Sequence, residues 1–578
     1  MTCRVWLLIP LCALWVGCLE CLDSSQCPST QACVSGLCQD DPAALPDDER
    51  PRPVLGGSSS GGASSSGGSG SSGGPVCTPN TAVCAGQVSG VCDANGVLTE
   101  EDCDPLLGLG CDPSLGRCVG ACSAGSLDAD YFGCDYWPTV TPNAVYRRFS
   151  YAVAVANTES VPTSVTISHA GVVLASFIVN ANSIEVTTLP WVDELKGGDF
   201  DELVVPPLPG ASRVVVDSAY RLRSTLPVTV YQFSPLEYRL DNVANCPGDP
   251  PCRSFSNDAS LLLPSHVLGT SYTVMSWPSQ GVGGFISVTA TQDNTTVSVT
   301  GAGSDTAAEG GGIRGDGSGT AVLNEGDVLQ VFSSQDLLDA DLSGTRIQAS
   351  RPVMVVGGHI CANVPDLTVA YCDHLEETHA PSDTLGREYV VTVPATPGGV
   401  TANHMLRLSA AQGFSTVTFD PPVATSATLQ PGEKPLDVLA VSQDVHITGT
   451  APLLVAHFMQ GSTITPGARG DPSMALAVPT EQFRSRYIFI ASSTYDESYV
   501  NIIAPLAAVV RLDNAPVPET AFQRVSGSSW RVARVPLPRT PEFHEVRASL
   551  PVGIVVYGYG VDTSYMYAGG TNLQTISP

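Results

Sequence analysis

The sequence predicts an all-β protein with about four repeated β units of roughly 100 residues each, preceded by small disulfide-rich modules. Val, Thr and Ser dominate long stretches, Gly and Pro are plentiful, and the helix-favouring Lys and Glu are scarce, a composition that favours strands and turns. A proline followed by a strongly apolar strand recurs four times, and cysteines crowd into short segments near the start. These three observations predict the fold class.

The repeat is visible in three signatures. The proline that precedes an apolar strand recurs at spacings of 125, 100 and 99 residues, and it fits because the first residue of a strand can lack its N–H. These prolines are Pro227, Pro352, Pro452 and Pro551. A second signature places Pro eight residues before a strand Tyr, at Pro264/Tyr272, Pro381/Tyr389 and Pro479/Tyr487. The third is a pair of alternating strands around a short turn, beginning at Tyr151, Ile286, Met405 and Val500.

These signatures divide a large domain, residues 122–578, into units at approximately 130–245, 257–372, 373–473 and 474–570. Alternating strands are half buried, and continuous apolar runs such as PVMVV indicate strands buried on both faces. Either a propeller-like arrangement or four tandem sandwiches fits this pattern. A closed ring would remove exposed sheet edges, which favours the propeller-like arrangement.

The first residues resemble an export signal. Residues 1–17 contain Arg4 followed by an apolar run from Val5 to Val16, which is too short to cross a bilayer as a helix. The run ends in Trp15-Val16-Gly17-Cys18, which resembles a bacterial lipobox with Cys18 as the lipidated residue, although Trp15 stands where Leu is preferred. We expect lipid anchoring at the outer membrane or cell surface, with plain cleavage and secretion as the alternative.

The cysteine count supports export. Of 19 cysteines, two lie in the signal, and setting Cys18 aside for lipid leaves an even number that can all pair. A short module, residues 18–38, holds four cysteines besides Cys18, and a second module, residues 77–121, holds six. Both lack the apolar residues for a core, so we expect disulfides to stabilise them, with the connectivity left open. Two further pairs are expected, Cys122 with Cys134 and Cys246 with Cys252.

A linker, residues 39–76, separates the two modules. It is rich in Pro and Asp, and Gly56 to Gly74 consists of Gly, Ser and one Ala, a flexible coil that reaches about 25 Å. Its matches to GxSxG and GxGxxG lack the strand-turn-helix context that gives those motifs meaning. We expect the linker to hold the rest of the protein clear of the membrane.

The segment 359–379 carries the most metal-like residues of the chain. His359, Cys361, Cys372, His374 and His379 are of zinc-ligand types. The favoured interpretation is a Cys361–Cys372 disulfide with exposed histidines alongside, because the chain is expected in an oxidising compartment. Zinc is the alternative. His374 to His379 reads HLEETH, which is not the HExxH motif.

Other candidate chemistry is weaker. Asp128, Asp130 and Asp135 lie close together without EF-hand spacing, so solvated turn residues are expected and a Ca²⁺ site is the alternative. No local signature marks a catalytic nucleophile, and we predict neither an enzyme nor a cofactor. Five aromatics could form a binding face, although core positions are expected for most: Trp137, Tyr231, Trp277, Tyr557 and Tyr559. The formal charge of −29 argues against nucleic acid or an anionic membrane surface as a partner.

Four long collinear stretches resemble the IgG Fc-binding protein N-terminal domain family. They are NDASLLLPSHVLGTSYTVMSWP (257–278), GTRIQASRPVMVVGGHICANVPDLTVAYCDHLEE (344–377), GDPSMALAVPTEQFRSRYIF (470–489) and VYGYGVDTSYMY (556–567). The resemblance covers roughly residues 122–570, and the front of the chain resembles predicted lipoproteins of myxobacteria. Self-cleaving GDPH sites occur in other domains of an animal member. In this chain Ser473 follows Gly470-Asp471-Pro472, so we predict no cleavage.

The resemblance implies an extracellular binding or adhesion module with no family-wide catalytic residues. We therefore expect a surface protein or a glycan as the ligand, contact with the membrane only through the N-terminal lipid, and no nucleic acid. Two alternatives stay open. One is a secreted metal-dependent hydrolase with its site in the 359–379 loop, and the other is a purely structural envelope protein.

Overall fold

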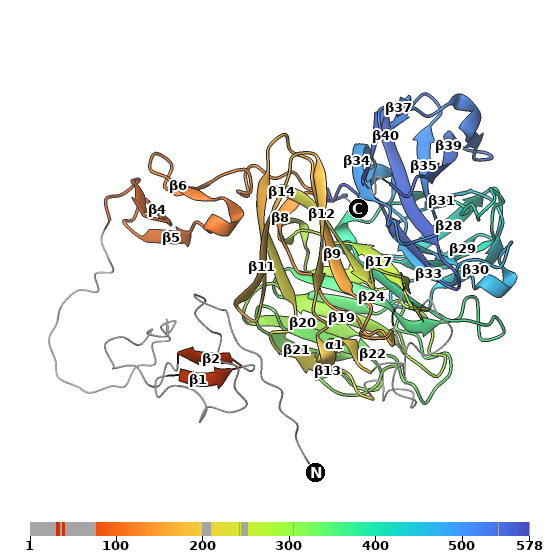
Figure 1. Ribbon diagram of the computed structural model, residues 1–578, viewed down its shortest axis with the longest axis horizontal. Helices are drawn as coiled ribbons and strands as arrows, with labels where there is room; N and C mark the ends of the chain where they lie inside the picture. Colours follow the sequence, from red (N-terminus) through yellow and green to blue (C-terminus); the bar gives the residue numbers. More distant parts are fainter. Residues whose placement is uncertain are drawn as a thin grey trace, which may run out of the picture. The chain divides into compact units, whose positions relative to one another are not determined.

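Figure 1 shows a computed structural model of the chain. The structure describes residues 31–34, 37–40, 77–198, 210–241, 243, 252–303, 306–540 and 543–576. The chain divides into two compact parts, Met1–Gly73 and Gly74–Pro578. In the first part, β1 (Gln31–Val34) pairs antiparallel with β2 (Leu37–Asp40).

The cysteine-rich module at the start of the second part has two small antiparallel sheets. One contains β3 (Ala82–Ala85), β4 (Val88–Cys92) and β5 (Leu98–Asp102), and the other contains β6 (Gly110–Asp112) and β7 (Arg117–Val119). A 3₁₀ turn, η2 (Pro105–Leu107), joins them. Three disulfides link the module, Cys77–Cys92, Cys84–Cys111 and Cys103–Cys118. With so few apolar residues available, these crosslinks replace a hydrophobic core.

The remainder of the chain repeats one eight-stranded antiparallel sandwich four times. We label the strand positions a to h in chain order. In every sandwich one sheet has the order d-c-f-a and the other has the order e-b-g-h. The all-β class with about four repeated units is therefore confirmed, and each unit is a sandwich of two four-stranded sheets.

The first two sandwiches contain the following strands, in the order a to h. Sandwich 1 contains β8 (Gly133–Tyr136), β9 (Tyr151–Asn157), β10 (Thr163–His169), β11 (Val172–Val179), β12 (Ser183–Leu189), β14 (Tyr220–Ser234, positions f and g) and β17 (Asp258–Leu261). Sandwich 2 contains β18 (Ser271–Thr273), β19 (Gly284–Ala290), β20 (Thr295–Thr300), β21 (Gly319–Leu323), β22 (Val328–Phe332), β23 (Arg346–Ala349), β24 (Val353–Ala362) and β25 (Asp373–Thr378).

The last two sandwiches follow the same order. Sandwich 3 contains β26 (Glu388–Val391), β27 (His404–Ala410), β28 (Ser415–Asp420), β29 (Ala427–Leu429), β30 (Leu436–Val441), β31 (Val445–Gly449), β32 (Leu453–Met459) and β33 (Ser473–Leu476). Sandwich 4 contains β34 (Arg484–Ile490), β35 (Glu497–Pro505), β36 (Val510–Leu512), β37 (Ala515–Pro516), β39 (Trp530–Leu537), β40 (Phe543–Tyr559, positions f and g) and β41 (Ser564–Ala568).

A few short elements decorate the repeat. They are α1 (Asp193–Lys196), β13 (Arg213–Val215), β15 (Arg239–Leu240), β16 (Cys252–Arg253), β38 (Phe522–Arg524), η3 (Ser265–Val267), η4 (Ser382–Thr384), η5 (Ser462–Ile464), η6 (Thr480–Gln482) and η7 (Glu519–Ala521). Strand β13 comes from a connection within sandwich 1 and pairs with β22 at the edge of sandwich 2. It therefore covers a sheet edge that would otherwise expose backbone hydrogen-bonding groups.

The repeated prolines lie between positions f and g, where the chain leaves one sheet and enters the other. Pro352 separates β23 from β24, and Pro452 separates β31 from β32. Pro227 and Pro551 lie inside the long strands β14 and β40, which pair with one sheet before the proline and with the other after it. Because proline has no N–H to donate, it marks the residue where one hydrogen-bond ladder stops and the next begins.

The repeated tyrosines join position a to position g. The Tyr272 hydroxyl donates to the Val353 carbonyl (2.7 Å), the Tyr487 hydroxyl donates to Val552 (2.6 Å), and Tyr389 bonds Leu453 in the same way. Sandwich 1 has an equivalent in Tyr136, whose hydroxyl donates to Val228 (2.6 Å). All four side chains are buried, so each hydroxyl requires the partner that it finds.

Strand pairing places the unit boundaries later than the sequence did. Position h of sandwich 1 is β17, which pairs with β14, and β25 and β33 likewise pair with β24 and β32. The sequence-based boundaries near residues 245, 372 and 473 instead separate these strands from the sheets that they complete. Each sandwich ends with its h strand, and a short 3₁₀ turn then leads to the next.

The four h strands, which we call the inner strands, meet at the centre of the repeat. Strand β17 contacts β25, β25 contacts β33, β33 contacts β41, and β41 contacts β17. The sandwiches therefore form a closed ring about a central axis (Figure 1). The ring closes where Leu573 N donates to Ala129 O (2.8 Å) and where Asp130 forms a bridge with Asn572.

Candidate functional site

The centre of the ring is held together by a buried carboxylate. Asp258, the first residue of β17, accepts hydrogen bonds from the N–H of Glu376 in β25 (3.2 Å), Met474 in β33 (3.3 Å) and Met566 in β41 (3.3 Å). Ser473 Oγ (2.9 Å) and the N–H of Ala259, the residue after Asp258 (3.0 Å), also donate to this carboxylate. One side chain of sandwich 1 therefore bonds the inner strands of the other three sandwiches.

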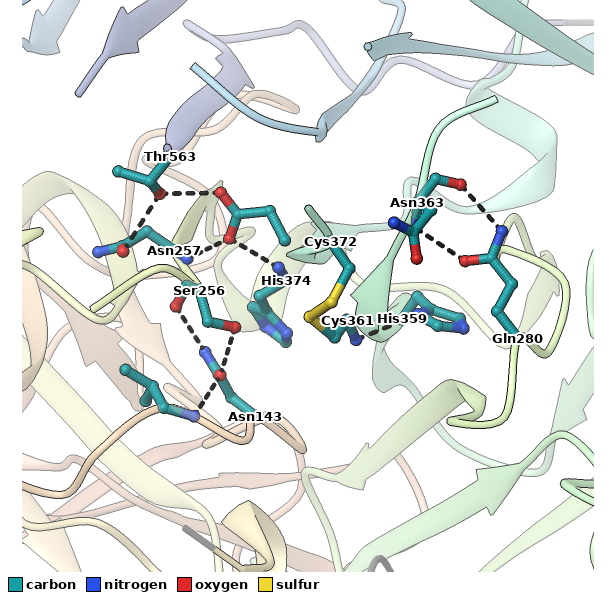
Figure 2. Close-up of a disulfide and its surroundings, with 12 residues drawn as sticks. Asn143, Ser256, Asn257, Gln280, His359, Cys361, Asn363, Cys372, His374 and Thr563 are labelled. Atoms are coloured by element: carbon teal, nitrogen blue, oxygen red, sulfur yellow. Dashed lines mark hydrogen bonds between the residues drawn. A yellow bond between two sulfur atoms is a disulfide. The ribbon is translucent and has the colours of Figure 1, made fainter. Parts of the chain in front are cut away.

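A second carboxylate lies at the start of β25. Asp373 accepts from Asn257 N of sandwich 1 (2.6 Å), and from Thr563 Oγ1 (2.8 Å) and Ser564 N (3.3 Å) of sandwich 4. Figure 2 shows Asn257 and Thr563 close to His374 and to the Cys361–Cys372 disulfide. Burial raises the pKa of both Asp258 and Asp373 well above the ordinary value, while these hydrogen bonds act in the opposite direction.

A pocket of about 430 Å³, which we call the axial pocket, opens at the ends of the inner strands. Its lining is Tyr146, Phe255, Tyr371, Asp471, Asp562 and the disulfide-bonded pair Cys361 and Cys372. Sandwich 1 contributes Tyr146 and Phe255, sandwich 2 contributes Tyr371 and both cysteines, and sandwiches 3 and 4 contribute one aspartate each. All four repeats thus supply part of this pocket. Its volume is in the range of small-molecule and side-chain binding sites.

Three of the lining residues have a left-handed backbone. Phe255 (φ 53°), Tyr371 (φ 68°) and Asp562 (φ 59°) each lie within three residues of the inner strand that follows. Such a conformation costs about 1–3 kcal/mol for a side chain other than glycine and is concentrated at functional sites. Phe255 and Tyr371 are 39% and 59% exposed as whole residues. The fold therefore holds two aromatic rings at the mouth of the pocket where neither contributes fully to a core.

The electrostatics of the pocket are acidic. Burial is the main cause that raises the pKa of Asp471 to about 7, and the charge of Asp562 acts in the same direction. The charge of Asp471 also helps to raise the pKa of Asp373. Among the described residues, no Lys or Arg forms an ion pair with Asp258, Asp373, Asp471 or Asp562. The axis therefore carries carboxylates without a cationic partner in the described chain.

The residues that suggested zinc have other roles. Cys361 and Cys372 are joined in a disulfide (S–S 2.02 Å), so neither thiol is available as a metal ligand. The expectation of exposed histidines was wrong, because His359, His374 and His379 are fully buried. His379 Nε2 accepts from Met275 N (2.8 Å), and His359 Nδ1 accepts from Cys361 N (3.1 Å). In the described part of the chain, no three His, Cys, Asp or Glu side chains are grouped as a metal site would require.

His374 belongs instead to a buried network between sandwiches 1 and 2. Its Nε2 lies 3.1 Å from Thr141 Oγ1, and Thr141 also bonds the Glu376 carboxylate. Gln232 Nε2 donates to the other oxygen of Glu376 (3.1 Å). The network joins strand β14 to inner strand β25, and its role in the described structure is to connect two sandwiches.

The remaining predicted residues lie apart from the pocket. Cys122 is bonded to Cys134 at the entrance to sandwich 1. Cys252 is disulfide-bonded, whereas Cys246, like Cys18, lies outside the described residues. Asp130 pairs with Arg484, and Asp135 pairs with Arg221 (2.9 Å), so these two are not solvated turn residues. The five aromatics are all buried, as expected for most of them, so they do not form the alternative binding face.

Sequence reasoning missed the residues that form the pocket. Phe255, Tyr371, Asp471 and Asp562 are far apart in the chain. The last three lie in stretches that resemble the family, but no binding role was assigned to them. One signal could have found them: each lies two or three residues before an inner strand. Aligning the four repeats on these strands would have placed the four residues at one end of a common axis.

Fold and site together define a class of protein: a closed ring of four β-sandwiches with a pocket that all four line at one end of the inner strands. Residues 258–558, more than half of the chain, match the sequence model of the family described as IgGFc binding protein, and the chain belongs to this family. The match begins at Asp258, the first residue of inner strand β17.

A curated relative supports this assignment. The IgGFc-binding protein of Homo sapiens is 26% identical to the chain over 332 residues. The aligned region covers 56% of this chain and 6% of the human protein, so the chain spans only a small part of that relative's length.

Proposed function

We propose that this chain is an exported, surface-tethered binding protein whose ring recognises a protein partner at the axial pocket. The observation that carries the proposal is the pocket itself, which all four sandwiches line and where two exposed aromatic rings are held by a left-handed backbone. Partly exposed aromatics at a concave site are typical binding anchors. The family description and the name of the human relative, both of which refer to binding IgG Fc, support a protein as the ligand.

The tether is part of the same proposal. Cys18, as the lipidated residue, would anchor the chain at the outer membrane, and the linker of residues 39–76 would extend the ring from the surface. The described residues include no helix with the length and apolarity that a membrane crossing requires. Labelling cells with an alkyne-bearing fatty acid tests the anchor: the native chain is expected to take up the label, and Cys18→Ser is expected to lose it. Equal labelling of both would contradict the anchor.

Recognition is tested with the full chain carrying Cys18→Ser, immobilised and exposed to surface proteins, to IgG Fc and to a glycan array. We expect a protein to be captured, and capture to fall about tenfold when Phe255 and Tyr371 are both changed to Asn, a residue that tolerates a left-handed backbone. The control is Phe414→Asn, which removes an exposed ring (66%) outside the pocket.

Two outcomes would contradict this proposal. Capture that is unchanged in the Phe255/Tyr371 variant would place recognition elsewhere. Binding to glycans alone would assign a different ligand class.

A further inference from the structure

We propose that the axial pocket receives a cationic side chain, arginine or lysine, from the protein partner. This inference rests on the proposed function and names the chemistry that the pocket selects. It is carried by the combination of aromatic rings and carboxylates at one concave site.

The first step concerns charge. Asp471 and Asp562 line the pocket, and no Lys, Arg or His is among its described lining residues. Below them, Asp373 is fully buried, and it too has no cationic partner in the described chain. Burial without a counter-charge favours the neutral form of a carboxyl group, and a cation that enters the pocket favours the ionised form, so the two are coupled. The net charge of −29 acts in the same direction, because it attracts a basic partner over a longer range.

The second step concerns the rings. The guanidinium carbon of Arg148 lies 5.6 Å from the ring centroid of Tyr146, so the face of this ring is already occupied by a cation of the same chain. Phe255 and Tyr371 are the exposed rings of the pocket, and they come from different sandwiches. An ammonium or guanidinium group is attracted to the face of such rings, and arginine also stacks on them. Rings and carboxylates in one pocket thus match both the apolar stem and the charged end of a basic side chain.

A pH dependence follows from the same geometry. Asp471 has a pKa of about 7 because it is buried. Asp562 and Asp373 interact with it electrostatically, and Tyr146 and Tyr371 line the same pocket. A bound cation favours the ionised carboxylate. Affinity for a basic side chain is therefore expected to increase as pH rises from 6 to 8.

The test uses the full chain with Cys18→Ser and three small probes: N-acetyl-arginine amide, N-acetyl-lysine amide and the uncharged isostere N-acetyl-citrulline amide. Saturation-transfer NMR and calorimetry measure binding. We expect the arginine and lysine probes to bind at least about tenfold more tightly than the citrulline probe. A tenfold difference in dissociation constant corresponds to only a small difference in binding free energy.

Variants locate the site. Asp562→Asn is expected to weaken binding of the arginine probe at least about fivefold, and Tyr371→Asn is expected to weaken its binding by a similar factor. Asp471→Asn is expected to weaken it and to abolish the increase between pH 6 and 8. The matched control is Asp366→Asn. Asp366 is solvent-exposed, lies in the loop of sandwich 2 that carries Tyr371 and does not line the pocket, so this variant should leave binding unchanged.

The proposal is overturned if the citrulline probe binds as tightly as arginine, if Asp562→Asn has no effect, or if Ca²⁺ binds stoichiometrically and displaces the arginine probe. Partner capture by the native chain separates this inference from the proposed function. Capture that depends on Phe255 and Tyr371, without binding of the basic probes, would reject the cationic ligand alone. Absence of both would reject both.

Discussion

At the scale of single residues, the Asp258 side chain connects all four sandwiches of the ring. It accepts five hydrogen bonds, and four of the donors belong to the other three sandwiches. Leaving a buried N–H without a partner costs about 1–3 kcal/mol. The Asp258 carboxylate provides the partner for buried N–H groups of three other strands. Nothing in the local sequence NDASL distinguishes Asp258 from an ordinary turn aspartate, because its partners come from strands more than 100 residues away.

Asp471 allows a residue-scale prediction on pH. Its pKa in the folded chain is about 7, above the ordinary value near 3.8. The neutral carboxyl group therefore stabilises the folded chain fully below about pH 4, and this stabilisation is lost as the pH rises through 7. Asparagine stays neutral and can still accept the hydrogen bond from Ser462 N (3.0 Å). Asp471→Asn should therefore match the native chain near pH 4 and be more stable at pH 8, by at most about 4 kcal/mol.

Urea unfolding at several pH values measures this difference. Asp366→Asn serves as the control, because Asp366 is exposed and its pKa is lowered by hydrogen bonds from Thr368. If native and Asp471→Asn chains showed the same dependence on pH, Asp471 would titrate normally and the acidic character of the pocket would need revision.

At the scale of elements, the sandwiches are joined by arginines that reach from one to the next. Arg407 in β27 is only 3% exposed, and it pairs with Asp341 (2.7 Å) of sandwich 2 and with Asp437 (2.8 Å) of its own sheet. It also donates to Ser276 O (2.9 Å) and lies 5.1 Å from the Trp277 ring centroid. Arg534–Asp444 and Arg484–Asp130 join the next two sandwich pairs.

Arg407→Lys tests this connection. A lysine ammonium is a point charge that cannot reproduce the fork of bonds to two carboxylates and a carbonyl, so at least one buried group is left unpaired. We expect a loss of about 2–4 kcal/mol in the free energy of unfolding, measured by chemical denaturation. Arg539→Lys, at a side chain that is 55% exposed, should cost less than about 1 kcal/mol. Equal effects of the two substitutions would contradict the structural role of Arg407.

At the scale of the whole ring, closure depends on the segment after β41. Asn572 N donates to Gln482 O (2.9 Å), Leu573 N donates to Ala129 O (2.8 Å), and the Leu573 side chain is buried. The Leu573–Ala129 bond joins the end of the last sandwich to the segment that leads into the first, while Asn572 bonds the turn that precedes β34. A ring that is closed by few contacts should unfold cooperatively, because opening one seam exposes the inner strands of all four sandwiches.

A chain that ends after Gly570 should therefore lose about 3–5 kcal/mol, from one buried leucine and several hydrogen bonds. Hydrogen exchange should increase in both β8 and β34, on the two sides of the seam. The control ends after Ile576 and keeps every contact named above. Faster exchange confined to sandwich 4 would show that the seam does not couple the two ends.

Much of the fold was predictable from local patterns. Pro352 and Pro452 directly precede strands as predicted, whereas Pro227 and Pro551 lie inside β14 and β40 where these strands change sheets. The unit boundaries were not predictable in this way. An h strand such as DASL is short, and whether it pairs with the strand before it or opens the next unit is decided by distant hydrogen bonds.

The sequence by itself determined the all-β class, the four repeats and their strands, because periodicity, proline chemistry and composition act over a few residues. It also carried the family resemblance. Only the tertiary structure decided that the repeats close into a ring and that Phe255, Tyr371, Asp471 and Asp562 meet at its axis. The physical reason is that the pocket is formed by residues whose proximity depends on four inner strands packing together. No interaction within any one repeat specifies that arrangement.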